Sequence, residues 1–221
     1  MKENARYGGL KVYSLPGYSR RMDILVATFN QHKIQELAPL FPGHRLLSPL
    51  DLGYPEIEIE EDGSNYFENA LIKAKAMHRL AGMITLADDS GLSVDALGGG
   101  PGIHSSRYGS RDGRTKLSSE ERNVLLLADM KGIEERACAF YCCLVLLHGP
   151  DRFVSVQETC PGILTDAPRG SGGFGYDPLV YLPELGKTVA ELSPAEKNIV
   201  SHRGKGARLM NSIIAAVKLE P

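Results

Sequence analysis

The 221-residue sequence lacks several features that would set its class at once. No apolar run reaches the roughly 18 residues that a membrane-spanning helix needs. There is no long linker, internal repeat or low-complexity block, and the GxxxxGK[ST] pattern of a P-loop is absent. These absences argue against a helical membrane protein, a repeat protein and a P-loop nucleotidase.

An excess of charge of one sign is also missing. The chain has 25 Lys and Arg against 27 Asp and Glu, a formal net charge of -2, so nothing indicates a nucleic-acid surface. A local basic pocket for a small phosphorylated ligand remains open. Residues 1–21 carry positive charge without the apolar segment of a secretory signal, and we expect a poorly structured extension there. Residues 22–221 are expected to form a single domain.

Cysteine is scarce, with four residues in the chain. Cys138, Cys142 and Cys143 lie in one apolar run, Cys160 lies further on, and no CxxC pair is present to bind zinc. Neighbouring cysteines in one strand are poorly placed to pair with each other. We interpret all four as reduced core residues of a cytoplasmic protein, with no membrane and no nucleic-acid partner.

Hydrophobic periodicity predicts an α/β fold. Helices are expected over residues 31–41, 65–82 and 118–132, and a final helix over 194–220. Strands are expected over residues 23–28, 56–63, 83–91, 136–149 and 151–164, the last two as an antiparallel pair. Because strands alternate with helices early and cluster later, the sheet should be mixed.

The stretch "TFNQHK", Thr28 to Lys33, stands where the first strand meets the first helix. Backbone N–H groups at a helix start are unpaired, and the helix dipole adds partial positive charge there. A hydroxyl, an amide and an ammonium beside that end would make a seat for phosphate. The alternative is that Asn30 only caps the helix and that Lys33 is solvated.

Two adjacent aspartates, Asp88 and Asp89, follow an apolar stretch in "LADDSG". Like charges this close raise one pKa unless a cation neutralises them, and Mg²⁺ does so with oxygen ligands and bound phosphates. Ser90 and Gly91 would form a tight loop that lets a ligand approach the backbone. The alternative is a turn with capping aspartates. Other carboxylates of this acidic set are Glu60, Glu61, Asp62 and Glu68.

Two glycine-rich loops carry further polar groups. In "GGGPGIHSSRYG" Arg107 could reach a phosphate or a carboxylate, and His104 could line a site or be structural. In "RGSGGFGYDP" Phe174 and Tyr176 could stack on a base, and Asp177 could accept from base N–H groups. For the second loop, the alternative is an ordinary loop with one buried aromatic residue.

The stretch "SPAEKNIVSHRGKGARL" brings Lys197, His202 and Arg203 close to a helix start. Lys197 and Arg203 are fixed cationic donors, and the charge of His202 depends on pH. A basic helix face is the alternative. Combined with the loops and the acidic set, these residues indicate a nucleoside triphosphate site without a P-loop.

In this order, "TFNQHK", "EEDGSNYFENALIKAKA", "LADDSGLSVDALGGGPGIHSSRYG", "GGFGYDPLV" and "AEKNIVSHRGKGARL" closely resemble the Ham1/RdgB/inosine triphosphate pyrophosphatase family, from Asp23 to Leu219. The resemblance implies an α/β fold with a long central mixed β-sheet, flanking helices and two lobes around a cleft. It implies a magnesium-dependent homodimer. The implied activity is hydrolysis of noncanonical purine nucleotides (ITP, dITP and XTP) to the monophosphate and pyrophosphate, which prevents their incorporation into DNA and RNA.

The resemblance also implies a role for each matching residue. Asp89 is the implied proton acceptor and a metal ligand, Asp88 supports the metal through water, and Glu60 is the second metal ligand, with Glu61 one residue away. Phe29 stands where relatives commonly have a small residue, and His104, where relatives often carry tyrosine, receives no role. Implied substrate contacts are Thr28, Phe29, Asn30, Gln31, His32, Lys33, Lys73 and Ser90 on the phosphate side, with Phe174, Gly175, Tyr176, Asp177, Lys197, His202 and Arg203 around the base.

We therefore expect water, activated by Asp89 and Mg²⁺, to attack the α-phosphate, while Lys33 and Lys73 offset the charge of the leaving pyrophosphate. A site that hydrogen-bonds the 6-oxo edge and crowds a 2-amino group would select the base. Two alternatives remain at this point: a Maf-like pyrophosphatase of modified nucleotides, and a nucleotide-sensing module that does not hydrolyse its ligand.

Overall fold

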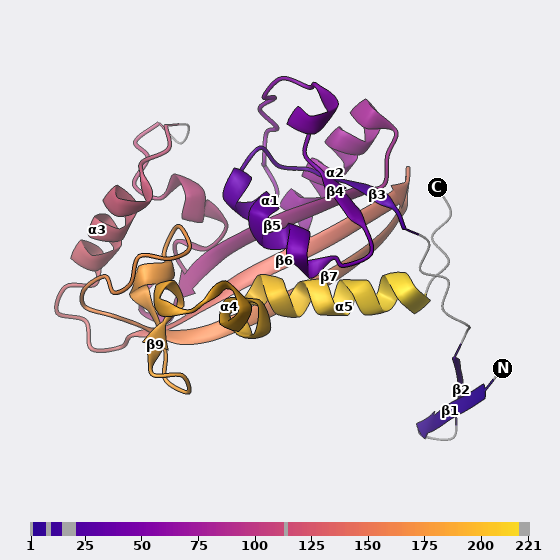
Figure 1. Ribbon diagram of the computed structural model, residues 1–221. Coiled ribbons are helices and arrows are strands. Elements are labelled where there is room, and N and C mark those ends of the chain that lie inside the picture. The colour runs from indigo at the N-terminus through magenta and orange to yellow at the C-terminus, as the bar shows by residue number, and fades with distance from the viewer. Residues whose placement is uncertain (1, 8–9, 15–20, 113–114, 217–221) are drawn as a thin grey trace.

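A seven-stranded sheet joins the two halves of the molecule in a computed structural model (Figure 1). The structure describes all residues except 1, 8–9, 15–20, 113–114 and 217–221. Across the sheet the strand order is β4-β3-β5-β6-β7-β8-β9. The strands are β3 (Asp23–Val26), β4 (Arg45–Leu47), β5 (Thr85–Val94), β6 (Ala137–Gly149), β7 (Arg152–Leu164), β8 (Val180–Leu182) and β9 (Lys187–Thr188).

The sheet is mixed, as predicted. β3 pairs in parallel with β4 and with β5, and every later pairing in the sheet is antiparallel. β6 and β7 each have 13 residues, which at about 3.4 Å per residue makes them roughly 40 Å long. Strands of this length extend from the first lobe into the core of the second, so they connect the two lobes.

Helices cover both faces of the first half of the sheet. α2 (Tyr66–Ala81) packs on β5 and β6, whereas α5 (His202–Ala216) packs on β6 and β7 from the other side (Figure 1). Successive side chains of a strand point to opposite faces. Val145 of β6 therefore shares a core with Ala74 of α2, while Leu144 shares the opposite core with Met210 of α5.

The second lobe has its own core around α3 (Ser119–Asp129). Leu126 and Met130 pack there against Phe140 of β6 and Val180 of β8. α1 (Gln31–Leu37) lies in the first lobe with α5, and its Leu37 is in the core that contains Met210. The α/β architecture with a long mixed sheet and two lobes is thus confirmed.

Three sequence expectations differ from the structure. Residues 56–63 do not form a strand, although their apolar and acidic residues alternate. Ile59 packs against the core beneath α2, and Glu61 turns towards Lys73. No described strand pairs with this segment. The alternation therefore records only which side chains turn towards the core. Within residues 1–21, β1 (Lys2–Tyr7) and β2 (Leu10–Ser14) form an antiparallel hairpin where we expected little structure.

The final helix is also broken, into α4 (Pro194–Val200) and α5. Ser201 between them has extended backbone angles (φ -67, ψ 154), and its Oγ accepts the N–H of Gly204 at 3.0 Å. The two helices then approach so closely that a Cβ on Gly204 would lie 1.9 Å from the carbonyl oxygen of Asn198. The break places His202 and Arg203 in the first turn of α5.

The four cysteines are free and buried, as expected from the sequence. Burial raises the pKa of the Cys143 thiol to about 11, so this group is uncharged at neutral pH. No helix within the described part of the chain combines the length and the apolar character needed to cross a membrane.

The close approach of α4 and α5 predicts that Gly204→Ala destabilises the protein by about 2 kcal/mol, because an overpacked backbone contact must open. Gly206→Ala is the matched control two residues further along α5. Its Cβ would meet side chains and no backbone, Leu144 at 3.3 Å and Sγ of Cys142 at 3.4 Å, and alanine favours the helix. Urea unfolding of both variants measures the difference, and equal losses would contradict this explanation of the junction.

Candidate active site

A cavity of about 890 Å³ lies between the two lobes, and most of the predicted site residues line it. The predicted residues on its walls are Thr28, Phe29, Asn30, Lys33, Lys73, Asp89, Ser90, Phe174, Gly175, Tyr176, Asp177, His202 and Arg203. The structure brings together residues from five sequence motifs, as a single site requires. Gln31, His32, Lys197 and Glu60 are not part of the lining.

The start of α1 is held by its own polar side chains. The Asn30 side chain accepts the backbone N–H groups of His32 at 3.0 Å and of Lys33 at 3.3 Å, so Asn30 caps the helix. The Thr28 hydroxyl accepts the N–H of Asn30 at 3.1 Å. Lys33 is not simply solvated, because its ammonium lies 3.1 Å from Oδ2 of Asp88.

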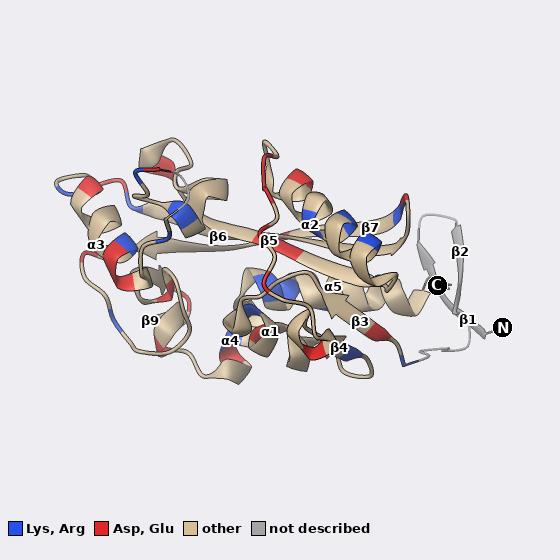
Figure 2. Ribbon diagram, turned by 90° about the horizontal axis from the view of Figure 1, so that it is seen from above, with Lys and Arg blue, Asp and Glu red and all other residues tan. Residues whose placement is uncertain are grey.

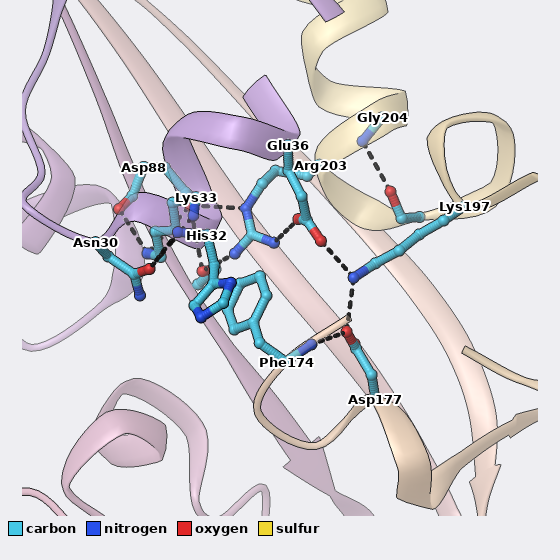
Figure 3. Close-up of polar contacts among 12 residues, drawn as sticks. Asn30, His32, Lys33, Glu36, Asp88, Phe174, Asp177, Lys197, Arg203 and Gly204 are labelled. Atoms are coloured by element: carbon cyan, nitrogen blue, oxygen red, sulfur yellow. Dashed lines mark hydrogen bonds and ion pairs between the residues drawn. The ribbon is translucent and has the colours of Figure 1, made fainter. Parts of the chain in front are cut away.

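Asp88 is wholly buried and held by two cations (Figure 3). Nε of Arg203 lies 2.8 Å from Oδ2 of Asp88, the oxygen that Lys33 also contacts. Burial alone would raise the pKa of Asp88, but Arg203 and then Lys33 outweigh it and hold the pKa below its ordinary value. Asp88 is therefore a permanent anion that fixes two cationic side chains beside the cavity.

Asp89 points to the opposite face of β5, because adjacent residues of a strand alternate. Its Oδ1 accepts from the ammonium of Lys73 on α2 at 2.6 Å. Its Oδ2 is buried and has no hydrogen-bond partner among the described residues. Burial raises the pKa of Asp89, with Lys73 opposing the shift. The adjacent aspartates are thus turned to opposite faces by the strand itself, and each has its own cation.

Lys73 also binds Glu61, whose Oε2 lies 2.8 Å from the ammonium. Burial would lower the pKa of Lys73, but Asp89 and Glu61 outweigh it and raise the pKa, so this lysine stays protonated. Glu60, the carboxylate assigned from the resemblance, is exposed and lies outside the cavity lining. The geometry favours the neighbouring position, Glu61, for a role in the cavity.

Glu36 is a site residue that the sequence reasoning missed. Its Oε2 accepts from Nη1 of Arg203 at 2.8 Å, and its Oε1 is hydrogen-bonded to the ammonium of Lys197 (Figure 3). Lys197 in turn lies 2.6 Å from Oδ2 of Asp177. The signal was its spacing, because a residue three positions after Lys33 lies on the same side of a helix. Glu36 thereby links the first lobe to the "FGYD" loop.

The "FGYD" loop presents one aromatic side chain and buries the other. The Phe174 ring stacks on His32 with centroids 5.5 Å apart, and the cationic ends of Lys197 and Arg203 lie 5.2 and 5.4 Å from its centroid. Tyr176 is buried in the second lobe. Asp177 holds the loop, since its carboxylate accepts the N–H of Phe174 at 2.8 Å. Phe174 is therefore the aromatic residue of this loop that lines the cavity and keeps partial exposure.

Figure 2 shows the same charge arrangement on the whole molecule: acidic residues in the middle of β5 lie beside basic residues at the start of α5. In addition to its contacts with Asp88 and Glu36, Arg203 donates from Nη2 to the hydroxyl of Ser90 at 2.7 Å. Every cation on this side of the cavity therefore has at least one carboxylate partner, and the side carries no positive excess.

His202 is buried and stacks on Phe140, with centroids 5.0 Å apart. Its Nδ1 has no hydrogen-bond partner in the described part of the chain. Burial, with Arg203 adding to it, lowers the pKa of His202 well below its ordinary value. The ring is therefore neutral at pH 7, when one of its nitrogens donates and the other accepts.

The acidic groups supply a place for a divalent cation. No group of three His, Cys, Asp or Glu side chains among the described residues forms a ready metal site. Oδ2 of Asp89, however, is a buried oxygen without a partner, and Glu61 shares Lys73 with it. Oxygen donors of this kind suit Mg²⁺, which binds through one or two carboxylates together with substrate phosphates.

These features define what the site can do chemically. An anionic ligand would meet Lys33, Lys73 and Arg203, a flat base would meet Phe174, and a proton could be accepted at Asp89. Comparison with known proteins agrees with this chemistry. A model of the Ham1 family matches residues 24–213.

Two similar relatives are each named dITP/XTP pyrophosphatase. The one from Treponema denticola is 50% identical over 184 residues, which is 83% of this chain and 94% of that protein. The one from Geobacillus kaustophilus is 44% identical over 187 residues, 83% of this chain and 89% of that protein.

Solved structures are similar as well. The Staphylococcus aureus Ham1 protein has a TM-score of 0.77 and 34% identity, with 88% of this chain and 98% of that chain covered. A nucleoside-triphosphatase, dITP/XTP pyrophosphatase, from Mycobacterium abscessus has a TM-score of 0.65 and 39% identity, with 87% and 99% covered.

The buried neutral His202 predicts a pH-dependent stability. Because its pKa is lowered by folding, the unfolded chain binds a proton below about pH 6.5 that the folded chain does not. The free energy of unfolding should then fall by about 1.4 kcal/mol per pH unit as the pH drops from 6 to 5. Urea unfolding of the wild type and of His202→Asn isolates this contribution, because only the wild type should show the extra slope. Identical slopes would mean that His202 is protonated in the folded protein.

Proposed function

Because the chain belongs to the Ham1 family, we propose that it hydrolyses noncanonical purine nucleoside triphosphates (dITP, XTP and ITP) to the monophosphate and pyrophosphate. The family match over residues 24–213 supports the reaction, and the names of the similar relatives support the substrates. The single structural observation that carries the proposal is the free, buried Oδ2 of Asp89 beside the protonated Lys73. It places a proton acceptor next to a cation that can receive phosphate charge.

In the proposed reaction, Asp89 accepts a proton from the water that attacks the α-phosphate. Its raised pKa makes this carboxylate a better base than an exposed aspartate. Lys33 and Lys73 offset the negative charge that develops on the leaving pyrophosphate. Thr28 and Asn30 lie at the same wall and hold the phosphate chain in line.

We propose that Mg²⁺ is the divalent cation of this site and that Asp89 and Glu61 hold it. When bound, it neutralises phosphate charge and makes the phosphorus more open to attack. Glu61 suits this role because its pKa remains lowered: burial would raise it, but Lys73 outweighs burial. The carboxylate is thus charged at neutral pH.

Base selection is assigned to the second end of the cavity. Phe174 lines the cavity beside Arg203, whose guanidinium carries hydrogen-bond donors only. A 6-oxo group accepts from such donors, whereas the 6-amino group of adenine would bring further donors to them and leave both sides unpaired. ATP should therefore be a poor substrate. The homodimer stays a prediction from the resemblance, and the cytoplasmic location stays a prediction from the cysteines.

The activity is tested by pyrophosphate release from ITP, dITP, XTP, GTP, ATP and dTTP, with Mg²⁺ and with EDTA. We expect fast release from the first three, slow release from the others, and loss of all activity in EDTA. Release restricted to pyrimidine or modified nucleotides would contradict the proposal, as would tight nucleotide binding without any release.

The metal assignment is tested by a matched pair of variants at neighbouring positions. Glu61→Gln should raise the Mg²⁺ concentration needed for half-maximal rate by at least about tenfold, because one charged ligand is lost. Glu60→Gln should leave that concentration unchanged, since its side chain lies outside the cavity. If the effects are reversed, the original assignment to Glu60 is right.

A further inference from the structure

The part of the cavity lining that the second lobe contributes carries cations that the reaction described above does not use. Arg107, Lys116 and Arg122 all line the cavity. They come from the second lobe: Arg107 ends a short 3-10 helix (Gly102–Arg107), Lys116 precedes α3, and Arg122 lies within α3. Figure 2 shows basic residues in this region of the second lobe.

These cations differ from those of the first lobe in having no acidic partner. Within the described ranges, none of the three forms an ion pair. Arg122 is tied instead to backbone and hydroxyl groups: it donates to the carbonyl oxygen of Leu117 and, at 3.2 Å, to Oγ of Ser119. It also reaches the carbonyl oxygen of Ser106 at 3.4 Å, which braces the turn that presents Arg107.

Charge balance shows why the unpaired cations matter. On the first-lobe side, Lys33, Lys73 and Arg203 are each matched by one or more of Glu36, Glu61, Asp88 and Asp89. Glu56 and Glu58 add two further carboxylates to the lining. This side is therefore negative overall before any metal binds, and a triphosphate would be repelled unless positive charge were supplied from elsewhere.

We propose that Arg107 and Lys116 bind the β- and γ-phosphates, the part of the substrate that leaves as pyrophosphate, with Arg122 positioning the turn that carries Arg107. The inference rests on the proposed function for the identity of the ligand. The α-phosphate must lie near Asp89 and Lys73, so the terminal phosphates extend beyond them into the space that the second lobe borders. A guanidinium can hold phosphate oxygens in a fork, and an ammonium adds a point charge.

A second consequence concerns the two lobes. In addition to the first-lobe cations Lys33 and Lys73, the phosphate chain would be bound at its far end by cations of the second lobe. The substrate itself would then join the lobes across the cavity, and a monophosphate product, lacking the far phosphates, would not.

The test uses the full-length protein with Arg107→Gln, Lys116→Gln and the control Arg111→Gln. Arg111 is a cation of the same segment that lies outside the cavity lining. Three quantities are measured: KM for ITP, competitive inhibition by inorganic pyrophosphate, and competitive inhibition by IMP. Thermal unfolding of each variant confirms that it is folded.

We expect KM for ITP and the inhibition constant of pyrophosphate to rise about tenfold in Arg107→Gln and in Lys116→Gln, as for the loss of one charge-assisted hydrogen bond. Inhibition by IMP should not change, and Arg111→Gln should match the wild type. Weakened IMP binding, or no change in pyrophosphate inhibition, would overturn the proposal. Should one variant fail to fold, the other still decides.

Direct binding of pyrophosphate with Mg²⁺ separates this inference from the proposed function. If the wild type hydrolyses none of the nucleotides but Arg107→Gln still weakens pyrophosphate binding, the function is wrong and the phosphate site stands. If the wild type hydrolyses ITP and both variants bind pyrophosphate normally, the function stands and the phosphate site is wrong.

Discussion

The site depends on one geometric constraint, the alternation of side chains along β5. Asp88 and Asp89 are adjacent in sequence, and the strand turns them to opposite faces of the sheet. Asp88 meets Arg203 and Lys33 from α5 and α1, and Asp89 meets Lys73 from α2. Because α2 and α5 cover opposite faces, each carboxylate receives its own cation, and their mutual repulsion is reduced without a metal.

Each carboxylate leaves one buried oxygen without a hydrogen-bond partner among the described residues, Oδ1 of Asp88 and Oδ2 of Asp89. The two differ in that Asp89 lines the cavity and in the direction in which the fold shifts the pKa. Asp88 is fully buried, and its lowered pKa marks an interaction that stabilises the fold at neutral pH. Asp89 has a raised pKa and a buried oxygen without a partner, so its ionised form is disfavoured by the fold. A carboxylate such as Asp89, whose charged form is disfavoured inside a cavity, is suited to accept a proton or a cation. The neighbouring Asp88 supplies stability to the fold.

Much of this could be predicted from the sequence, for identifiable reasons. α2 was predictable because its apolar spacing, the cap at Asn65 and the left-handed Gly82 agree with one another. The structure of the "EIEIEE" segment was not predictable, because alternation indicates which side chains turn inward but not whether another strand lies alongside. The break at Ser201 was hidden because "EKNIVSHRGKG" has helical spacing on both sides of the serine.

The site residues divide in the same way. Asp89, Lys73 and Arg203 lie in motifs whose residue types already point to anion and metal chemistry. Glu36 lies in no such motif: its spacing from Lys33 is its one signal, and its role follows from contacts with Lys197 and Arg203 more than 160 positions away. The choice between Glu60 and Glu61 was beyond the sequence too, because a one-residue shift in an irregular segment reverses which side chain enters the cavity.

The most direct test of this account is to compare Asp88→Asn with Asp89→Asn by urea unfolding and by turnover of ITP at pH 7. The account predicts that Asp88→Asn loses about 3 kcal/mol of stability, because two buried cations lose their shared carboxylate. It predicts that Asp89→Asn is as stable as the wild type or more so, yet has lost nearly all turnover. Equal losses of stability in the two variants, or near-normal turnover in Asp89→Asn, would contradict the division of roles between the paired aspartates.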